Sequence, residues 1–456
     1  MSEIVATGEH AVGDSDREAD ERLAVLAEQV LETASRLGAS SAETAVSRSQ
    51  GFSATVRLGE VETIEHNRDK SLVVTVYFGQ KTGSASTSDF DAAAIEDTVR
   101  AACTIAKFTA EDDCAGLADA DRLATEIIDL DLEHPWDISV EQAIEMAKEC
   151  EDTARGYDAR ISNSEGATVN THRGSEVYAN TNGFVGVASG TRHSASCAVV
   201  GELQGNMQRD YWYTSARDYH DLESMASVGR TAAQRTVGRL GARKVKTTQC
   251  PVLYEAPVAA SLLSHFIGAV RGGALYRKAS FLLDHIGKPV FAEDITVSEY
   301  PHLPKAVGSA SFDGEGVATR TRDIVKAGVL KSYVLDSYSA RKLGMDTTGN
   351  AGGVRNLCIK PGDLQFEELI RTMGTGLLVT ELIGAGVNNV TGDYSRGVAG
   401  YWVEGGEIRH PVEEVTIAGN LKDLFRHIVE VGADVDTRGN YRSGSILIDR
   451  VTVAGE

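Results

Sequence analysis

The sequence has few cysteines and no long apolar run. Its six cysteines stand far apart, at positions 103, 114, 150, 197, 250 and 358, and no pair forms C-x-x-C. This spacing excludes a zinc ribbon or a thioredoxin-type redox motif. No stretch approaches the roughly 18 consecutive apolar residues of a membrane-spanning helix. The N-terminal stretch MSEIVATGEHAVGDSDREADE has no basic start and no apolar segment, so no secretory signal is predicted. We therefore expect a soluble, cytoplasmic protein without a membrane partner.

Positive charge is also scarce. The 456 residues include 45 Lys and Arg against 66 Asp and Glu, which gives a formal net charge of −21. Nucleic-acid surfaces need basic patches, so this balance argues against a nucleic-acid partner. A hydrophobic content of 42% and a charged content of 24% are ordinary for globular proteins. The length is sufficient for two or three domains with separate cores.

Several catalytic signatures are missing. The glycine-rich segments 347–353 and 374–386 contain neither a P-loop nor a dinucleotide-binding fingerprint. Turns and close backbone packing are the expected use of these glycines. The chain also has no G-x-S-x-G elbow and no H-E-x-x-H helix. The sequence therefore offers no standard nucleotide-binding, serine-hydrolase or zinc-peptidase motif.

The first part of the chain predicts a helix, a group of strands and a second helix. Residues 1–17 are small, polar and acidic, and predict a flexible tail. Residues 18–110 then show an apolar helical face that ends at Gly38, followed by strand patterns and another helical face. Breaks between the strands are expected at Gly59 and at 67–69, where Asn-Arg-Asp interrupts the apolar pattern.

Residues 139–240 repeat that order of elements. Residues 139–142 read Ser-Val-Glu-Gln, a capping box that opens a helix. Strands follow, with Asn182 and Gly183 as a strong hairpin signal, and a helix closes the segment. The repeat suggests two similar layered units within one N-terminal α/β domain over 18–244.

The character of the chain changes near residue 245. Residues 250–257 predict a strand that ends at Pro257, a favourable first residue for a helix. The helix that follows, through VAASLLSHFIGAV, is apolar nearly all round and is therefore expected to be buried. Beyond 300 the sequence is rich in glycine and short strands, with a turn predicted at Gly405 and Gly406. The predicted fold class is α+β, with a β-rich C-terminal domain over 245–456 that contains a buried helix.

Two places in the C-terminal domain are candidates for chemistry. His265 is the only histidine inside a strongly apolar helix, where a hydrogen-bonded core histidine is a commoner arrangement than a metal ligand. The second is a group of four polar residues between two glycines, which predicts a tight turn. This group either forms a structural Asp–Arg pair or lines a substrate cleft; its members are Asp393, Tyr394, Ser395 and Arg396.

Long segments of the chain resemble the TldD/PmbA family of bacterial metalloproteases, and within it the PmbA-type (TldE-type) subunit. The resemblance covers about residues 22–456. The segments that carry it are VRGGALYRKASFLLDHIGKPV (270–290), SYSARKLGMDTTGNAGG (337–353), MGTGLLVTELIGAGVNNVTGDYSRGVAGYWVEGGEI (373–408), PVEEVTIAGNLKD (411–423), GEVETIEHNRD (59–69), GSASTSDF (83–90) and GTRHSAS (190–196).

The resemblance implies a hetero-oligomeric metalloprotease of two related subunits. The TldD-type subunit carries H-E-x-x-x-H on a helix and a downstream Cys, and these residues build the zinc site. On that pattern the first His falls at His265, the Glu at Phe266, the second His at Val270 and the Cys at Ser443. Phenyl and isopropyl groups offer no lone pair to a metal or a proton, whereas zinc needs several N, O or S donors. The resemblance therefore implies no zinc site and no catalytic residues in this chain, with His265 as a remnant.

The resemblance implies a non-catalytic subunit in a one-to-one complex with a TldD-type subunit that supplies zinc. The family implies unfolded or flexible peptides as substrates, including leader segments, with the four residues 393–396 as channel candidates. Two alternatives stay open. One is a metallopeptidase active by itself, in which His265 would need donors such as His285, Asp393 or Glu404. The other is a peptide-binding adaptor without a proteolytic role.

Overall fold

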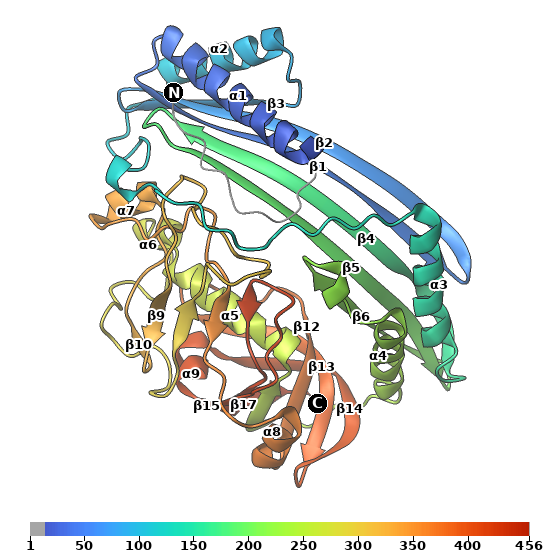
Figure 1. Cartoon of the computed structure of the whole chain (residues 1–456). Coiled ribbons are helices and arrows are strands. Elements are labelled where there is room, and N and C mark those ends of the chain that lie inside the picture. The colour runs from blue at the N-terminus through green and yellow to red at the C-terminus, as the bar shows by residue number, and fades with distance from the viewer. Residues whose placement is uncertain (1–13, 456) are drawn as a thin grey trace.

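The structure, a computed structural model, describes residues 14–455 and has a mixed α+β architecture (Figure 1). This confirms the predicted fold class. The first helix, α1 (Asp14–Arg36), starts inside the segment predicted to be a tail. Acidic residues near the start of a helix, such as Glu18, interact favourably with its N-terminal end, which accounts for the early start. The rest of the predicted tail, residues 1–13, lies outside the described residues.

The N-terminal part is built around one six-stranded antiparallel sheet with the order β3-β2-β1-β4-β5-β6. The helix–strands–helix order occurs twice, and the two groups of three strands join where β1 pairs with β4. Figure 1 shows the long strands of this sheet curving over the C-terminal part. The elements are α1, β1 (Ser41–Arg57), β2 (Glu60–Phe78), β3 (Lys81–Thr87) and α2 (Ala92–Phe108) in the first group, and α3 (Val140–Arg155), β4 (Ile161–Asn180), β5 (Val185–Leu203), β6 (Asn206–Ala216) and α4 (Met225–Gly238) in the second.

The hairpin between β1 and β2 is held at its tip by α3. Leu58 and Gly59 have φ of 55° and 82°, the left-handed values of a two-residue hairpin turn. Their backbone N–H groups donate to the fully buried carboxylate of Glu151, at 2.8 Å each. The expected break at 67–69 is absent, because these residues pair with Gly51, Gln50 and Ser49 of β1 along a continuous β2. The interstrand hydrogen bonds override the weak local strand propensity of Asn and Asp.

The two pairs of helices cover different halves of one face of this sheet. Under α1 and α2, Ala42 and Val46 of β1 are buried in one apolar cluster. Under α3 and α4, Ala54 and Val56 of the same strand are buried in another. Side chains of a strand alternate between faces, so these even-numbered residues share the covered face. Between these two groups lies a strip of β1 that includes Arg48 and Gln50, which belong to neither apolar cluster.

The C-terminal part contains two further sheets and several short helices. One sheet has the order β10-β9-β8-β11-β16, and the other has the order β14-β13-β12-β7-β17-β15. The elements are β7 (Thr248–Tyr254), α5 (Ala256–Val270), α6 (Gly272–Tyr276), β8 (Val297–Glu299), β9 (Arg322–Lys326), β10 (Val329–Leu330), α7 (Ser337–Leu343), β11 (Leu357–Ile359), α8 (Phe366–Met373), β12 (Gly376–Ile383), β13 (Asp393–Glu404), β14 (Glu407–Asn420), α9 (Leu421–Arg426), β15 (Ile428–Val431), β16 (Tyr441–Arg442) and β17 (Ile446–Ala454). Helix α5 shares one apolar core with residues of both sheets, as expected for a helix that is apolar nearly all round.

Charged side chains connect the sheet of the N-terminal part to the C-terminal part. Arg235 of α4 donates through Nη1 to both carboxylate oxygens of Glu255, at 2.9 and 3.0 Å, directly before α5. Arg438 lies over the ring of Trp212 in β6, with 4.2 Å between the guanidinium carbon and the ring centroid. The first contact ties the start of α5 to α4, and the second ties the segment before β16 to β6. Within residues 14–455, no helix combines the length and the apolar character that crossing a bilayer requires.

Candidate functional site

Helix α5 carries the positions that the family pattern relates to zinc chemistry. Pro257 lies in its first turn, where a missing N–H costs nothing. The N–H of Ala256 donates to Ser445 Oγ at 3.0 Å, so the helix start is tied to the loop before β17. Most of its side chains are buried, including Leu262, Leu263 and Phe266. The local sequence thus forms a helix packed into the apolar core along most of its surface, with Ser261, Ser264 and Gly268 on the side that is less buried.

His265 is half-buried and faces the phenol ring of Tyr394 on β13. The two ring centroids lie 5.9 Å apart in an edge-to-face arrangement. Within the described residues, the buried Nε2 of His265 has no hydrogen-bond partner, so a hydrogen-bonded core histidine is not what the structure contains. Burial, and then the nearby Arg396 guanidinium, lower the pKa of His265. The imidazole is therefore neutral near pH 7, and no carboxylate of the described residues supports it as a base.

Phe266 and Val270 point in a different direction from His265. They lie four residues apart, hence on one face of the helix, and both are fully buried. The Phe266 ring packs edge-to-face against Phe291 and Phe425, with centroids 5.0 and 6.1 Å away. His265 precedes Phe266 and is rotated by about 100° around the helix axis. In this structure Phe266 and Val270 lie in the apolar core, whereas the His265 ring lies against Tyr394.

Ser443 follows β16, a strand that contacts α5. Its side chain is fully buried, and its hydroxyl donates to the carbonyl of Gly444 at 2.7 Å. The hydroxyl is thus already used within its own loop. Zinc in a peptidase needs at least three N, O or S donors. One imidazole, two apolar side chains and this hydroxyl do not fit zinc, and residues 14–455 contain no group of three or more His, Cys, Asp or Glu placed to hold a metal ion.

The donors that an independent metallopeptidase would require are not brought to His265. The Nδ1 atom of His285 lies 2.6 Å from the carbonyl of Leu283. Glu404, at the far end of β13, accepts a hydrogen bond from the indole of Trp402 at 2.9 Å. The carboxylate of Asp393 is exposed and accepts hydrogen bonds from Thr391 and Asn420. These three side chains have local partners instead of a common centre.

The four residues 393–396 form the start of β13 and not the tight turn that was predicted. They pair with β14 along their whole length, from Asp393–Asn420 to Arg396–Ile417, and regular strand pairing explains the difference. The Asp–Arg pair, one of the two alternatives for this group, does not form, and the Arg396 Nε donates instead to the carbonyl of Ile383 at 3.4 Å. Alternation along the strand places Tyr394 and Arg396 on one face. Asp393 and Ser395 lie on the other face and are exposed.

Tyr394 and Arg396 form one polar group with Tyr254 and His265. Tyr254 is the last residue of β7 and lies beside Tyr394, and burial raises the pKa of both phenols. Within the described residues, neither phenol has a hydrogen-bond partner of acceptable geometry. Sequence reasoning missed Tyr254, although a polar tip at the end of an otherwise buried strand is a usable signal. The group offers neutral donors and one cation, but no carboxylate that could act as a general base.

The strands at this position have no free edge. On one side β13 pairs with β14, and on the other it pairs with β12 beyond Gly397. The N–H of Ser395 donates to the carbonyl of Gly386 at 2.7 Å, which closes the remaining gap. A peptide cannot be added here as a strand, because the backbone groups already have partners. Any contact of a peptide with this group is made by side chains.

Comparisons with known proteins identify the family. Three family models match consecutive parts of the chain: PmbA/TldA metallopeptidase domain 1 over residues 42–106, the central domain over 133–240 and the C-terminal domain over 247–455. The chain is 49% identical over 415 residues to the metalloprotease PmbA of Escherichia coli O157:H7, covering 91% of this chain and 92% of the relative. It is 46% identical over 428 residues to a PmbA homologue of Haemophilus influenzae, covering 93% and 94%.

Solved structures show the same fold. A crystal structure from Bacteroides thetaiotaomicron has a TM-score of 0.91 and 29% identity, covering 98% of this chain and 100% of that chain. The crystal structure of TldE from Thermococcus kodakarensis has a TM-score of 0.83 and 21% identity, covering 94% and 100%. The second likeness is a likeness of fold.

Proposed function

Because the chain belongs to the PmbA/TldA metallopeptidase family, we propose that it is the non-catalytic subunit of a two-subunit metalloprotease. It pairs one-to-one with a TldD-type subunit in the cytoplasm, and the pair cleaves unfolded peptides, including leader segments. The partner holds zinc. This chain contributes part of the wall of the substrate chamber, and neither nucleic acid nor membrane is a partner.

The observation that carries the proposal is the apolar packing of α5. Phe266 occupies the position where the family pattern has its general base, and its ring is fully buried against Phe291 and Phe425. A carboxylate at this position would be buried without a partner, at a cost of several kcal/mol. The position therefore supports packing and not proton transfer. Activity in its own right has no comparable support, since His285, Asp393 and Glu404 have local partners.

The role of this chain in substrate binding is assigned to the polar group beside α5. Arg396 carries the only cation of that group and lies next to two phenols and one neutral imidazole. A guanidinium with neutral neighbours binds a peptide carbonyl or carboxylate well, because charge-assisted hydrogen bonds are stronger than neutral ones. Tyr394 adds an apolar face and a hydroxyl. Asp393 and Ser395 lie on the other face of β13 and belong to a different surface.

Co-expression with the TldD-type subunit tests the pairing. We expect the two chains to elute together as a one-to-one complex that cleaves an unfolded peptide faster than either chain alone. If they never elute together and the partner alone cleaves as fast as the mixture, the proposal is wrong.

Within the complex, Arg396→Gln tests the substrate contact. We expect peptide turnover to fall about ten- to a hundredfold at unchanged zinc content, the effect of losing a charge-assisted hydrogen bond. The matched control is Ser395→Ala, a substitution one residue away on the other face of the strand. Equal turnover by both variants would show that Arg396 does not contact the substrate.

A further inference from the structure

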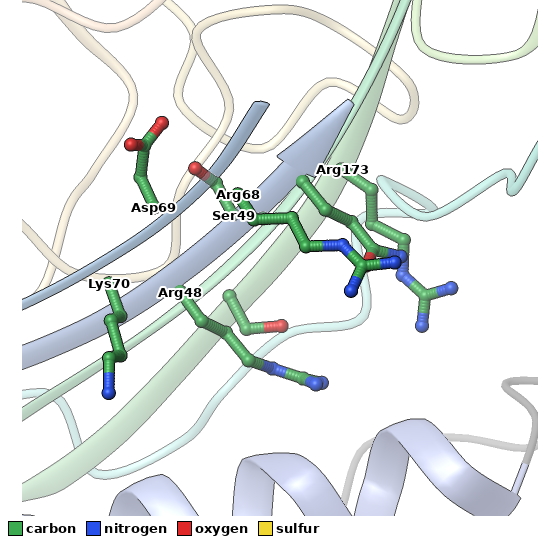
Figure 2. A pocket seen from close by; sticks show the side chains of 9 residues that line it. Arg48, Ser49, Arg68, Asp69, Lys70 and Arg173 are labelled. Carbon is green, nitrogen blue, oxygen red and sulfur yellow. The ribbon is translucent and has the colours of Figure 1, made fainter. Parts of the chain in front are cut away.

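A basic pocket lies in the middle of the N-terminal sheet, in the strip between the two apolar clusters, where Asp20 of α1 reaches Arg48. It is a cavity of about 300 Å³ formed by three neighbouring strands. Interstrand pairing places Arg48 of β1 opposite Lys70 of β2, and Gln50 between Arg68 of β2 and Arg173 of β4. Figure 2 shows Arg48 and Lys70 on the side of the strands away from Asp69. We call these four cationic residues the basic pocket.

The basic pocket occupies positions that are core positions elsewhere on the same strands. Arg48 continues the alternation of Ala42 and Val46, which are fully buried under α1 and α2. Toward the other end of β1, Ala54 resumes the apolar pattern under α3. Charged residues thus replace apolar ones only in the strip between the helix pairs. The strip is therefore a polar, positively charged surface between two apolar cores.

The like charges of the basic pocket repel one another and so lower the stability of the fold. Like charges directly opposite each other on neighbouring strands are destabilising, and Arg48 faces Lys70 in this way. Asp20 of α1 lies 3.3 Å from Arg48, and Glu133 lies 3.5 Å from Arg173. Within residues 14–455, no carboxylate lies within ion-pairing distance of Arg68 or Lys70. Arg48 and Arg173 thus have carboxylate partners within the chain, and Arg68 and Lys70, both exposed, are the cations left for an anionic partner.

Protection of a sheet edge does not account for the cluster. Charged residues, Lys above all, commonly guard an exposed edge strand against unwanted pairing. Lys70 and Arg68 lie on such a strand, because β3 pairs only with Leu72–Phe78. Arg48 and Arg173, however, lie on β1 and β4, the two central strands of the sheet. These two interior arginines do not guard an edge and have carboxylate partners within the chain, so a ligand at this edge would meet Arg68 and Lys70.

We propose that the basic pocket binds the carboxylate side chains of an acidic, extended peptide. Among the described residues, Glu60–Ser71 of β2 have β1 as their only strand partner, which leaves about 12 residues of free edge. A peptide that pairs with this edge places alternate side chains on the face of Arg68 and Lys70. Acidic side chains at those positions reach the guanidinium and ammonium groups. Only one part of this proposal depends on the proposed function, namely that the ligand is a peptide.

Peptide binding by the full chain without its partner tests this site. The probe is a fluorescein-labelled octapeptide of alternating Glu and Thr, followed by fluorescence anisotropy. We expect Arg68→Glu with Lys70→Glu to weaken binding about ten- to a hundredfold, as the loss of charge-assisted hydrogen bonds predicts. Both side chains are exposed, so the fold is retained, which circular dichroism verifies. The neutral pair Arg68→Gln with Lys70→Gln should show an intermediate loss.

The control variant is Arg230→Glu, which reverses an exposed cation on α4 and should leave peptide affinity unchanged. Equal binding of a Gln–Thr octapeptide, or an unchanged affinity of the Arg68 and Lys70 variants, would overturn the proposal. So would displacement of the peptide by an equimolar amount of inorganic phosphate, which would indicate a site for a free oxyanion. Tighter binding of a thymidine octanucleotide would assign the pocket to nucleic acid instead. The binding assay uses this chain alone, whereas the cleavage assay uses the complex. The two assays can therefore give different results, and failure of one proposal can be told from failure of the other.

Discussion

Helix α5 and the central strip of the N-terminal sheet depart from expectation in opposite directions. On α5, apolar side chains stand where the family pattern has metal donors and a base, and Phe266 is packed on all sides. On the strip, Arg48, Lys70 and Arg173 stand where the alternation of the strands would place apolar residues. The first departure stabilises the fold at the expense of chemistry. The second does the reverse, because clustered cations lower stability and bind anions.

The comparison distinguishes catalysis, which the family name suggests for α5, from ligand binding, which we propose for the strip. The positions to which the family pattern assigns catalysis contribute Phe266 and Val270 to the apolar core, whereas the strip matches no motif and contains the proposed binding site. Function in this chain is therefore expected from binding surfaces and not from α5. Substitutions in the two regions should have opposite effects on stability.

The largest effect is expected for Phe266→Ala. Truncating a fully buried Phe removes its packing and leaves a cavity, so the free energy of unfolding should fall by about 3–5 kcal/mol in urea titrations. The matched control is Phe108→Ala at the end of α2, where the side chain is 88% exposed and the change should stay within about 0.5 kcal/mol. Similar losses for both variants would contradict the assignment of α5 to the core.

A smaller, pH-dependent effect is expected at the junction of the two parts. The Glu315 carboxylate accepts a hydrogen bond from the N–H of Ser337, and burial raises its pKa from 4.5 to about 7. The folded state thus holds a proton that the unfolded chain has released, so the contribution of Glu315 to stability is largest below about pH 4.5, falls toward pH 7 and is level above it. Over this range that contribution should fall by about 3 kcal/mol.

The measurement is urea unfolding of the wild type and of Glu315→Gln at several pH values. Other buried carboxyls with a raised pKa, such as Glu255 and Asp313, add slopes of the same sign to both proteins. The difference between the two proteins isolates Glu315. Parallel stability curves for the two proteins would show that Glu315 has an ordinary pKa.

The smallest effect has the opposite sign. Arg68→Gln with Lys70→Gln removes like-charge repulsion in the basic pocket, so the free energy of unfolding should rise by up to about 1 kcal/mol. The loss of the contact between Lys70 Nζ and the Phe90 ring, 5.0 Å from its centroid, offsets part of this gain. The gain should shrink at high salt, which screens exposed charges. A destabilised variant would mean that these cations support the fold.

Local patterns predicted much of this structure. The capping box at Ser139, the hairpin at 181–184 and the turn at Gly405 and Gly406 all form where the sequence indicates them. Each depends on residues within a few positions of one another, whose turn and cap geometry is set locally. The family resemblance is likewise confirmed, because it rests on long continuous segments.

Features that depend on distant residues were not predictable in this way. Arg48 and Arg173 lie 125 positions apart and meet only through the pairing of β1 with β4, so no local pattern marks the basic pocket. The residues 393–396 look like a turn because of their flanking glycines, but pairing with β14 makes them a strand. The absence of a partner for Nε2 of His265 also depends on packing that the sequence does not encode locally.

The central claim is that this chain is not itself the catalytic subunit, and zinc content tests it most directly. The measurement is elemental analysis of the full chain, purified without its partner and equilibrated with excess zinc before gel filtration. The account predicts no stoichiometric zinc, because Phe266 and Val270 face the apolar core and the Ser443 hydroxyl is used by Gly444. One equivalent of tightly held zinc, abolished by His265→Ala in a variant that remains folded, would contradict it.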